Sequence, residues 1–292
     1  MASVTGAGTP NTPRFQGGIE VIRVSVSVTD GKDRYVSGLS ETEFAVFEDG
    51  IRQEVSFFTR DALPLSVALL IDCSASMEQK IGVAQEAGVR FIHALRGGDL
   101  AQVVQFNDRV QVLHDYSSDQ VALESALRST RPSGATVLYN ALYVTLKELR
   151  TQGSPDAPRR LAVVLLSDGE DTASLATEEQ VLALAREAEI AVYAISLRPD
   201  TPLAREREGQ GRAKYFLTNL TRDTGGQVFF PARLSDLDSV YSRIATDLRS
   251  QYTLGYVSSN ATRDGRWRRI LVRTPQHEAL RSRHKLGYYG AR

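Results

Sequence analysis

The chain has 292 residues, with 35 basic and 35 acidic side chains, 42% hydrophobic residues and a single cysteine. This length supports a full hydrophobic core, and the ordinary composition excludes a disordered, collagen-like or coiled-coil chain. The net charge of zero provides no overall field that would attract nucleic acid or an anionic membrane. One cysteine excludes both an internal disulfide and a cysteine zinc cluster.

The first residues carry no targeting signal that we recognise. Residues 1–18 are rich in Gly, Pro, Thr and Ser and lack the apolar stretch of a signal peptide. We expect residues 1–17 to form a disordered tail. No apolar run in the chain reaches the roughly 20 residues that a membrane-spanning helix needs. The protein is then either cytoplasmic or a chain that begins after a removed signal.

The N-terminal flank, residues 18–62, has strand character. Apolar and polar residues alternate from Ile22 to Val28, which is the period of a half-buried strand. Further on, Glu48-Asp-Gly50 predicts a hairpin turn between a strand at 44–47 and one returning at 53–58.

The C-terminal flank, residues 250–292, is similar, with candidate strands at 252–256, 267–272 and 286–289. Short strand groups are marginal alone because they leave apolar faces bare. We therefore expect the two flanks to pair into one accessory β subdomain. The alternative is that each flank packs separately on the main domain.

Residues 63–249 follow another pattern, in which nearly all-apolar runs at 65–71, 161–166 and 190–197 alternate with helical spacing. Such runs are typical of strands covered on both faces of a parallel sheet. The expected helices lie at 77–95, 118–127, 139–149, 177–187, 215–223 and 234–248. The alternation predicts an α/β domain with a doubly wound, mostly parallel sheet.

Two of the buried strands end in carboxylates. Asp72 follows the run 65–71 and alternates with Ser74 and Ser76, while Asp168 follows the run 161–166. Open α/β sheets bind ligands at the carboxyl ends of their strands, and in the usual strand order these two strands are neighbours. Carboxylate and hydroxyl oxygens suit a hard divalent cation, with Mg²⁺ preferred and Mn²⁺ or Ca²⁺ as alternatives. Taken alone, the Asp72 motif fits a helix cap equally well.

Further oxygen ligands lie nearby in the sequence. Thr136 stands at an expected loop-to-helix junction between the two acidic segments, where its hydroxyl would face the same crevice. Glu170 and Asp171 follow Asp168 closely. They would form a second cation site or hydrogen-bond the metal ligands from behind, although we favour a solvated acidic loop.

The order and spacing of Asp72-x-Ser74-x-Ser76, Thr136 and Asp168 resemble the metal-ion-dependent adhesion site (MIDAS) of the von Willebrand factor type A domain. The flanks resemble those of bacterial proteins related to this family, which are abundant in acidobacteria. This second resemblance covers nearly the whole chain after about residue 17.

The resemblance implies a role for each ligand. Ser74 and Ser76 would bind the cation directly, Thr136 would do so in the ligand-engaged form, and Asp72 and Asp168 would often act through water. One coordination position would stay open for a partner's carboxylate, which mostly neutral ligands favour because they leave the ion electrophilic. Ala75 departs from the glycine of many relatives, which matters only if the loop needs a positive φ there.

These observations predict a non-enzymatic module that binds an acidic side chain of a protein partner through a divalent cation. The resemblance also favours an extracytoplasmic location, secreted or periplasmic. A metal-independent interaction scaffold is the alternative, and a Mg²⁺-dependent hydrolase or phosphatase is less favoured. The four histidines have no zinc-ligand spacing, and no P-loop or nucleophile elbow is present. We interpret the basic segment 263–285 as a solvated strand face rather than a nucleic-acid site.

Overall fold

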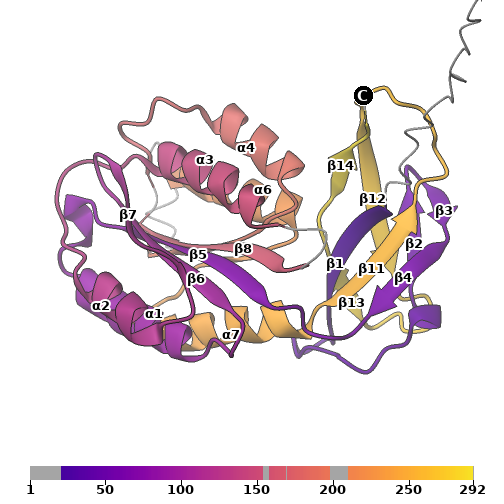
Figure 1. Cartoon of the computed structure of the whole chain (residues 1–292), viewed down its shortest axis with the longest axis horizontal. Coiled ribbons are helices and arrows are strands. Elements are labelled where there is room, and N and C mark those ends of the chain that lie inside the picture. Colours follow the sequence, from indigo (N-terminus) through magenta and orange to yellow (C-terminus); the bar gives the residue numbers. More distant parts are fainter. Residues whose placement is uncertain (1–20, 154–157, 169, 198–209, 292) are drawn as a thin grey trace, which may run out of the picture.

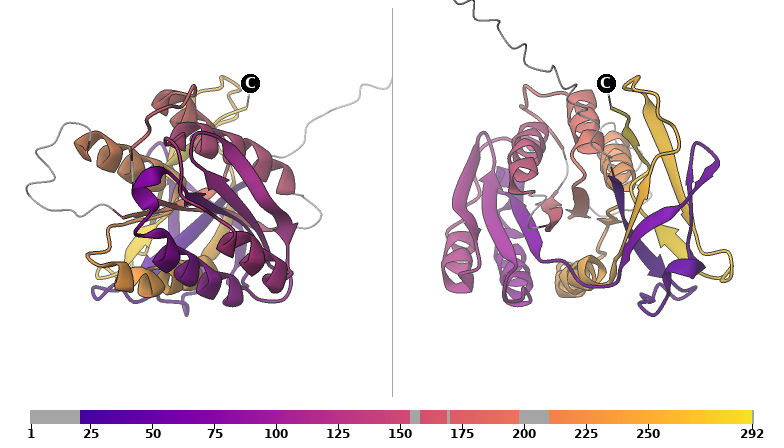
Figure 2. Two further views of the ribbon diagram at one scale, coloured as in Figure 1. Left: turned by 90° about the vertical axis from the view of Figure 1, so that its left-hand side faces the viewer. Right: turned by 45° about the vertical axis from the view of Figure 1, so that its right-hand side comes forward.

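The computed structural model describes residues 21–153, 158–168, 170–197 and 210–291. The expected tail at residues 1–17 lies outside this range. An α/β domain and a β subdomain lie side by side in Figure 1 and in the right panel of Figure 2. Among the described helices, none is long and apolar enough to cross a membrane.

A six-stranded sheet forms the centre of the α/β domain, in the order β10-β9-β8-β5-β6-β7. Neighbouring strands are parallel except for β7, which runs antiparallel to β6 at one edge. The strands are β5 (Leu65–Asp72), β6 (Leu100–Phe106), β7 (Val110–Ser117), β8 (Arg160–Ser167), β9 (Ala191–Ser196) and β10 (Val228–Phe229). The predicted mostly parallel, doubly wound sheet is thereby confirmed.

Helices cover both faces of this sheet, which explains why its central strands are apolar throughout. All eight residues of β5 are buried, and its side chains alternate between two hydrophobic cores. One core packs against α1 (Ile81–His93), α2 (Gln120–Arg128) and α7 (Leu237–Ser250), and the other against α3 (Leu138–Leu149), α4 (Glu178–Glu187) and α6 (Gln210–Thr224).

The helix limits differ in places from the sequence expectations. A 3₁₀ turn at Ala75–Met77 precedes α1, so the α-helix itself starts later than expected. Helix α2 begins two residues after the expected start at Ser118, and Asp119 caps it by accepting hydrogen bonds from two backbone N–H groups. Helix α6 begins five residues before the expected Tyr215.

The β subdomain consists of two four-stranded sheets, each of which combines strands from both ends of the chain. In one sheet β1 lies between β11 and β13, and in the other β12 lies between β2 and β14. The strands are β1 (Val21–Thr29), β2 (Ala45–Glu48), β3 (Ile51–Gln53), β4 (Val55–Thr59), β11 (Tyr252–Val257), β12 (Trp267–Arg273), β13 (Arg281–Arg283) and β14 (Gly287–Tyr289). The expected accessory β subdomain, built from both flanks, is present.

The predicted N-terminal hairpin is only partly right. Asp49 and Gly50 both have positive φ, 48° and 86°, as a tight turn between β2 and β3 requires. The returning segment then divides, because β3 ends at Gln53 and β4 crosses to the other sheet, where it pairs with β11. Strand β13 was not expected at all.

A buried polar cluster joins the α/β domain to the β subdomain, which we call the two lobes. Asp247 on α7 accepts hydrogen bonds from Ser27 on β1 and from the Tyr193 hydroxyl on β9, and it pairs with Arg283 on β13. A close backbone approach lies nearby, since a Cβ on Gly226 would sit 1.9 Å from the carbonyl oxygen of Val192. The contacts of Asp247 with Ser27 and Arg283 hold the β subdomain against the α/β domain, whereas the approach of Gly226 to Val192 lies within the α/β domain.

Candidate metal centre

The first candidate ligand, Asp72, ends β5 at the carboxyl edge of the central sheet and is fully buried. One carboxylate oxygen accepts the Ser74 backbone N–H at 2.9 Å, and the other accepts the Ser167 hydroxyl at 2.6 Å. Burial raises the pKa of Asp72, the two serines oppose this shift, and the nearby Asp168 charge adds to it. A positive charge close to this edge would therefore stabilise the ionised form.

The two candidate serines lie together. The hydroxyl oxygens of Ser74 and Ser76 are 3.1 Å apart, and Ser74 is 2% exposed whereas Ser76 is open to solvent. Ala75 lies in the 3₁₀ turn and is not among the described residues with positive φ. Alanine is thus accommodated where many relatives carry glycine.

Thr136 is held at the same edge by its backbone. Its N–H donates to the Thr172 hydroxyl at 3.0 Å, and its carbonyl accepts the Thr172 N–H at 2.9 Å. The loop before it is tied to the Asp72 loop, since the Ala75 N–H donates to the Gly134 carbonyl and the Ser133 N–H to the Cys73 carbonyl. These hydrogen bonds hold the loop of Asp72, Ser74 and Ser76 against the loop that precedes Thr136.

Asp168 forms an ion pair with Lys80. Its Oδ2 lies 2.7 Å from Nζ of Lys80, the residue just before α1. The Asp168 side chain is 6% exposed and that of Lys80 is 27% exposed. This ion pair was not predicted. The available signal was only that Lys80 follows Ser76 by one helical turn, which does not reveal its partner.

Glu170 and Asp171 are half-buried, so the favoured solvated acidic loop does not describe them. Asp171 instead holds local structure, because one of its oxygens accepts the backbone N–H of Tyr139 in the first turn of α3. Its other oxygen accepts the Ser174 N–H at 3.2 Å. Negative charge at a helix N-terminus is favourable. Asp171 thus stabilises the helix that follows Thr136.

The residues fit a divalent cation through hydroxyl chemistry. Neighbouring ligands of an octahedral Mg²⁺, each at roughly 2.1 Å, are about 3.0 Å apart, close to the separation of the two serine hydroxyls. In the described part of the chain, no group of three or more His, Cys, Asp or Glu side chains is placed to hold a metal. A ligand set of Ser and Thr oxygens with carboxylates behind them would suit a hard cation rather than a soft one.

A doubly wound sheet with a hydroxyl and carboxylate cluster at its carboxyl edge defines a class of α/β ligand-binding domain. Residues 67–170 match the sequence family described as the von Willebrand factor type A domain. This segment of the chain is therefore similar to the von Willebrand factor type A domain, as its sequence motifs predicted.

The chain is also similar to individual proteins, and the solved structures among them share its fold. The chain is 24% identical over 220 residues to a UPF0353 protein of Nocardia farcinica, a match that covers 66% of each chain. A solved structure of a von Willebrand factor type A protein from Catenulispora acidiphila is similar to this chain, with a TM-score of 0.53 and 12% sequence identity. The match covers 95% of this chain and 76% of that one. Proximal thread matrix protein 1 of the mussel byssus, solved with a zinc-occupied MIDAS motif, has a TM-score of 0.51 at 18% identity over 68% of this chain and 48% of that one.

Proposed function

We propose that this chain is a protein-binding module. In this module, a divalent cation held at the candidate metal centre binds a carboxylate of a protein partner. Von Willebrand factor type A domains are interaction modules, and the dependence on a cation is the specific part of the proposal. The observation that carries it is the 3.1 Å separation of the Ser74 and Ser76 hydroxyls beside two buried carboxylates.

In this proposal, Ser74, Ser76 and Thr136 hold the cation, and Asp72 and Asp168 offset its charge. The bound cation would supply a strong electrostatic attraction for an incoming carboxylate. The Asp72 oxygens are already oriented by Ser74 and Ser167. The site therefore needs little rearrangement on that side before it binds an ion.

The proposal is tested by thermal unfolding of protein stripped of metal on a chelating resin, with and without Mg²⁺, Mn²⁺ or Ca²⁺. A ligand that binds only the folded state at 100 times its Kd stabilises it by about 2.7 kcal/mol. For a domain of this size, that raises the midpoint by roughly 5–10 °C. The increase should disappear in Asp72→Asn and Ser76→Ala.

Ser125→Ala is the matched control for Ser76→Ala, because Ser125 is an exposed serine on α2, away from this edge. It should keep the full response to metal. The partner chemistry is tested by titrating an amide-capped glutamate into metal-free and Mn²⁺-loaded protein. Stabilisation by glutamate only when Mn²⁺ is present supports the carboxylate step. A wild-type chain with no response to any of the three cations would contradict the cation-dependent function.

A further inference from the structure

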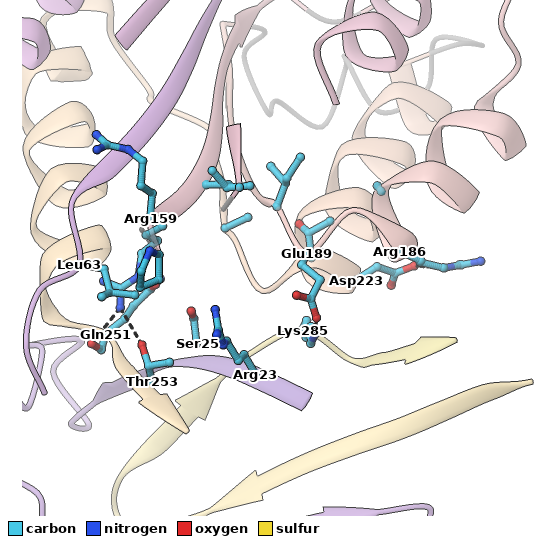
Figure 3. A pocket seen from close by; sticks show the side chains of 18 of the residues that line it. Arg23, Ser25, Leu63, Arg159, Arg186, Glu189, Asp223, Gln251, Thr253 and Lys285 are labelled. Atoms are coloured by element: carbon cyan, nitrogen blue, oxygen red, sulfur yellow. Dashed lines mark hydrogen bonds and ion pairs between the residues drawn. The ribbon is translucent and has the colours of Figure 1, made fainter. Parts of the chain in front are cut away.

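A second site lies far from the candidate metal centre, in the cleft between the two lobes. A cavity of about 640 Å³ is lined there by the first residues of β8 and β9, the C-terminal ends of α4 and α6, and strands β1 and β11 (Figure 3). Asp168 follows the last residue of β8, whereas Arg160 at the cavity is its first. The cavity therefore sits at the opposite edge of the central sheet, and its volume is that of a small-molecule site.

Strand β1 gives this cavity a polar wall. Val24 and Val26 point into the core of the β subdomain, so alternation places Arg23 and Ser25 on the other face. That face is turned toward the cleft, where Figure 3 shows Arg23 and Ser25 below the cavity. Ser25 pairs across the sheet with Thr253 on β11, which also lines the cavity.

Arg160 supplies a buried positive charge, with only 4% of its surface exposed. Its guanidinium donates to the Leu248 and Gln251 carbonyls and to the Thr253 hydroxyl, while its Nε has no hydrogen-bond partner. Burial lowers the pKa of Arg160, and the nearby Tyr193 and Asp247 oppose this shift. A buried charge held only by neutral acceptors is costly, and a bound anion would relieve that cost.

The acids near Arg160 are already used. Asp247, whose charge acts on Arg160, is paired with Arg283. At the cavity itself, Glu189 pairs with Lys285 and Asp223 pairs with Arg186.

The charge of Arg23 is likewise uncompensated. Its side chain is exposed, and it makes no hydrogen bond or ion pair within the described ranges. Together, Arg23 and Arg160 leave an excess of positive charge in the cleft of a chain whose net charge is zero.

We propose that the cleft binds a small anion with two or more negative charges, of phosphate or polycarboxylate chemistry, between Arg23 and Arg160. Guanidinium groups bind such oxygens in bidentate fashion, and the hydroxyls of Ser25 and Thr253 are placed to add donors. Arg160 belongs to the α/β domain and Arg23 to the β subdomain, so one anion contacts both lobes. This site is independent of the metal-binding proposal.

The test is calorimetric titration of the whole chain with inorganic phosphate and with citrate, at constant ionic strength in buffer treated with chelating resin. EDTA is avoided because it is itself a polyanion. Arg23→Gln should weaken binding about fivefold, through the loss of charge-assisted hydrogen bonds. Arg52→Gln is the control, because Arg52 is an exposed strand arginine that does not line this cavity.

A second variant, Ser25→Glu, places a carboxylate of the chain itself inside the cavity and should abolish binding of the added anion. Binding of phosphate alone, or of citrate alone, supports the site and identifies its chemistry. The proposal is overturned if wild type binds neither anion, or if Arg23→Gln and Ser25→Glu both bind as tightly as Arg52→Gln.

Discussion

The ion pair between Lys80 and Asp168 leads to a prediction with two opposite signs. Without a metal, the Lys80 ammonium supplies the positive charge beside two buried carboxylates, Asp168 and Asp72. A divalent cation would have to share Asp168 with this ammonium or displace it. Lys80→Met keeps most of the side-chain length and removes the charge. We expect it to destabilise the metal-free protein and to strengthen metal binding.

The size of the effect follows from the burial of the pair. Removing one partner of a fully buried pair costs about 3–5 kcal/mol, whereas exposed pairs are worth about 0–1 kcal/mol. Lys80 is 27% exposed and Asp168 6% exposed, so we expect an intermediate cost of about 1–2 kcal/mol. This corresponds to a fall of roughly 2–8 °C in the midpoint of the metal-free protein. In Lys80→Met, a divalent cation no longer has to overcome the energy of this ion pair. The affinity of the protein for the cation should therefore rise about tenfold.

Two measurements on the same samples check this prediction. The thermal midpoint is recorded in metal-free buffer, and the Kd for Mn²⁺ is measured by calorimetry. Lys147→Met serves as the control, because Lys147 is an exposed lysine on α3 for which no ion pair is found within the described residues. It should change neither quantity appreciably.

The reasoning is refuted if Lys80→Met binds Mn²⁺ within twofold of the wild type while its metal-free midpoint falls. Lys80 would then contribute to folding without competing with the cation. An unchanged midpoint together with an unchanged Kd would show that the ion pair contributes nothing in solution.

Three further predictions concern the scaffold. Burial lowers the pKa of His284 below its ordinary 6.5, so below that pH the unfolded chain binds more protons than the folded one. The free energy of unfolding should therefore fall by up to about 1.4 kcal/mol for each pH unit below about 6.5. In urea titrations between pH 7.5 and 5.5, His284→Gln should lose less stability than the wild type, and an equal loss in both would contradict this prediction. Asp247→Asn removes the buried partner of Arg283 and should cost about 2–4 kcal/mol in urea unfolding, whereas a cost below about 1 kcal/mol would mean that the cluster does not join the lobes. The new Cβ of Gly226→Ala would collide with the Val192 carbonyl, so this variant should lose about 3 kcal/mol or more of unfolding free energy. The Cβ of the control Gly97→Ala meets open space, and its stability should stay within about 1 kcal/mol of the wild type. Similar thermal midpoints for the two variants would count against the close approach.

The parts of the fold that were predictable are those in which burial dictates composition. Strands β5 and β8 are covered on both faces, so their sequences are almost wholly apolar and their ends are marked by the first carboxylate. Their parallel pairing follows from the usual strand order, and it brings the segments of Asp72 and Asp168 to one edge. Sequence spacing alone therefore predicts which segments form the candidate site, and the metal ligation of that site is a prediction.

Other features of the structure cannot be predicted from the spacing of residues along the sequence. Strand β13 is three residues long, Arg-Ser-Arg, and it pairs with β1 through its backbone, so it shows no apolar alternation. Ser118 and Asp119 are both good caps, and only the start of α2 distinguishes them. The contact of Lys80 with Asp168 and the positive cleft require the positions of elements that are distant in the chain.

The pairing of the two chain ends has a consequence for the order of synthesis. Val21 on β1 pairs with Val257 on β11, so β1 emerges early from the ribosome and its partner only after the whole α/β domain. At about 5–20 residues per second, the wait is on the order of 10–50 seconds. During that time the apolar face of β1 and the hairpin β2–β3 have no permanent neighbour. The α/β domain can therefore fold first, and the β subdomain can form only after β11 and β12 have been synthesised.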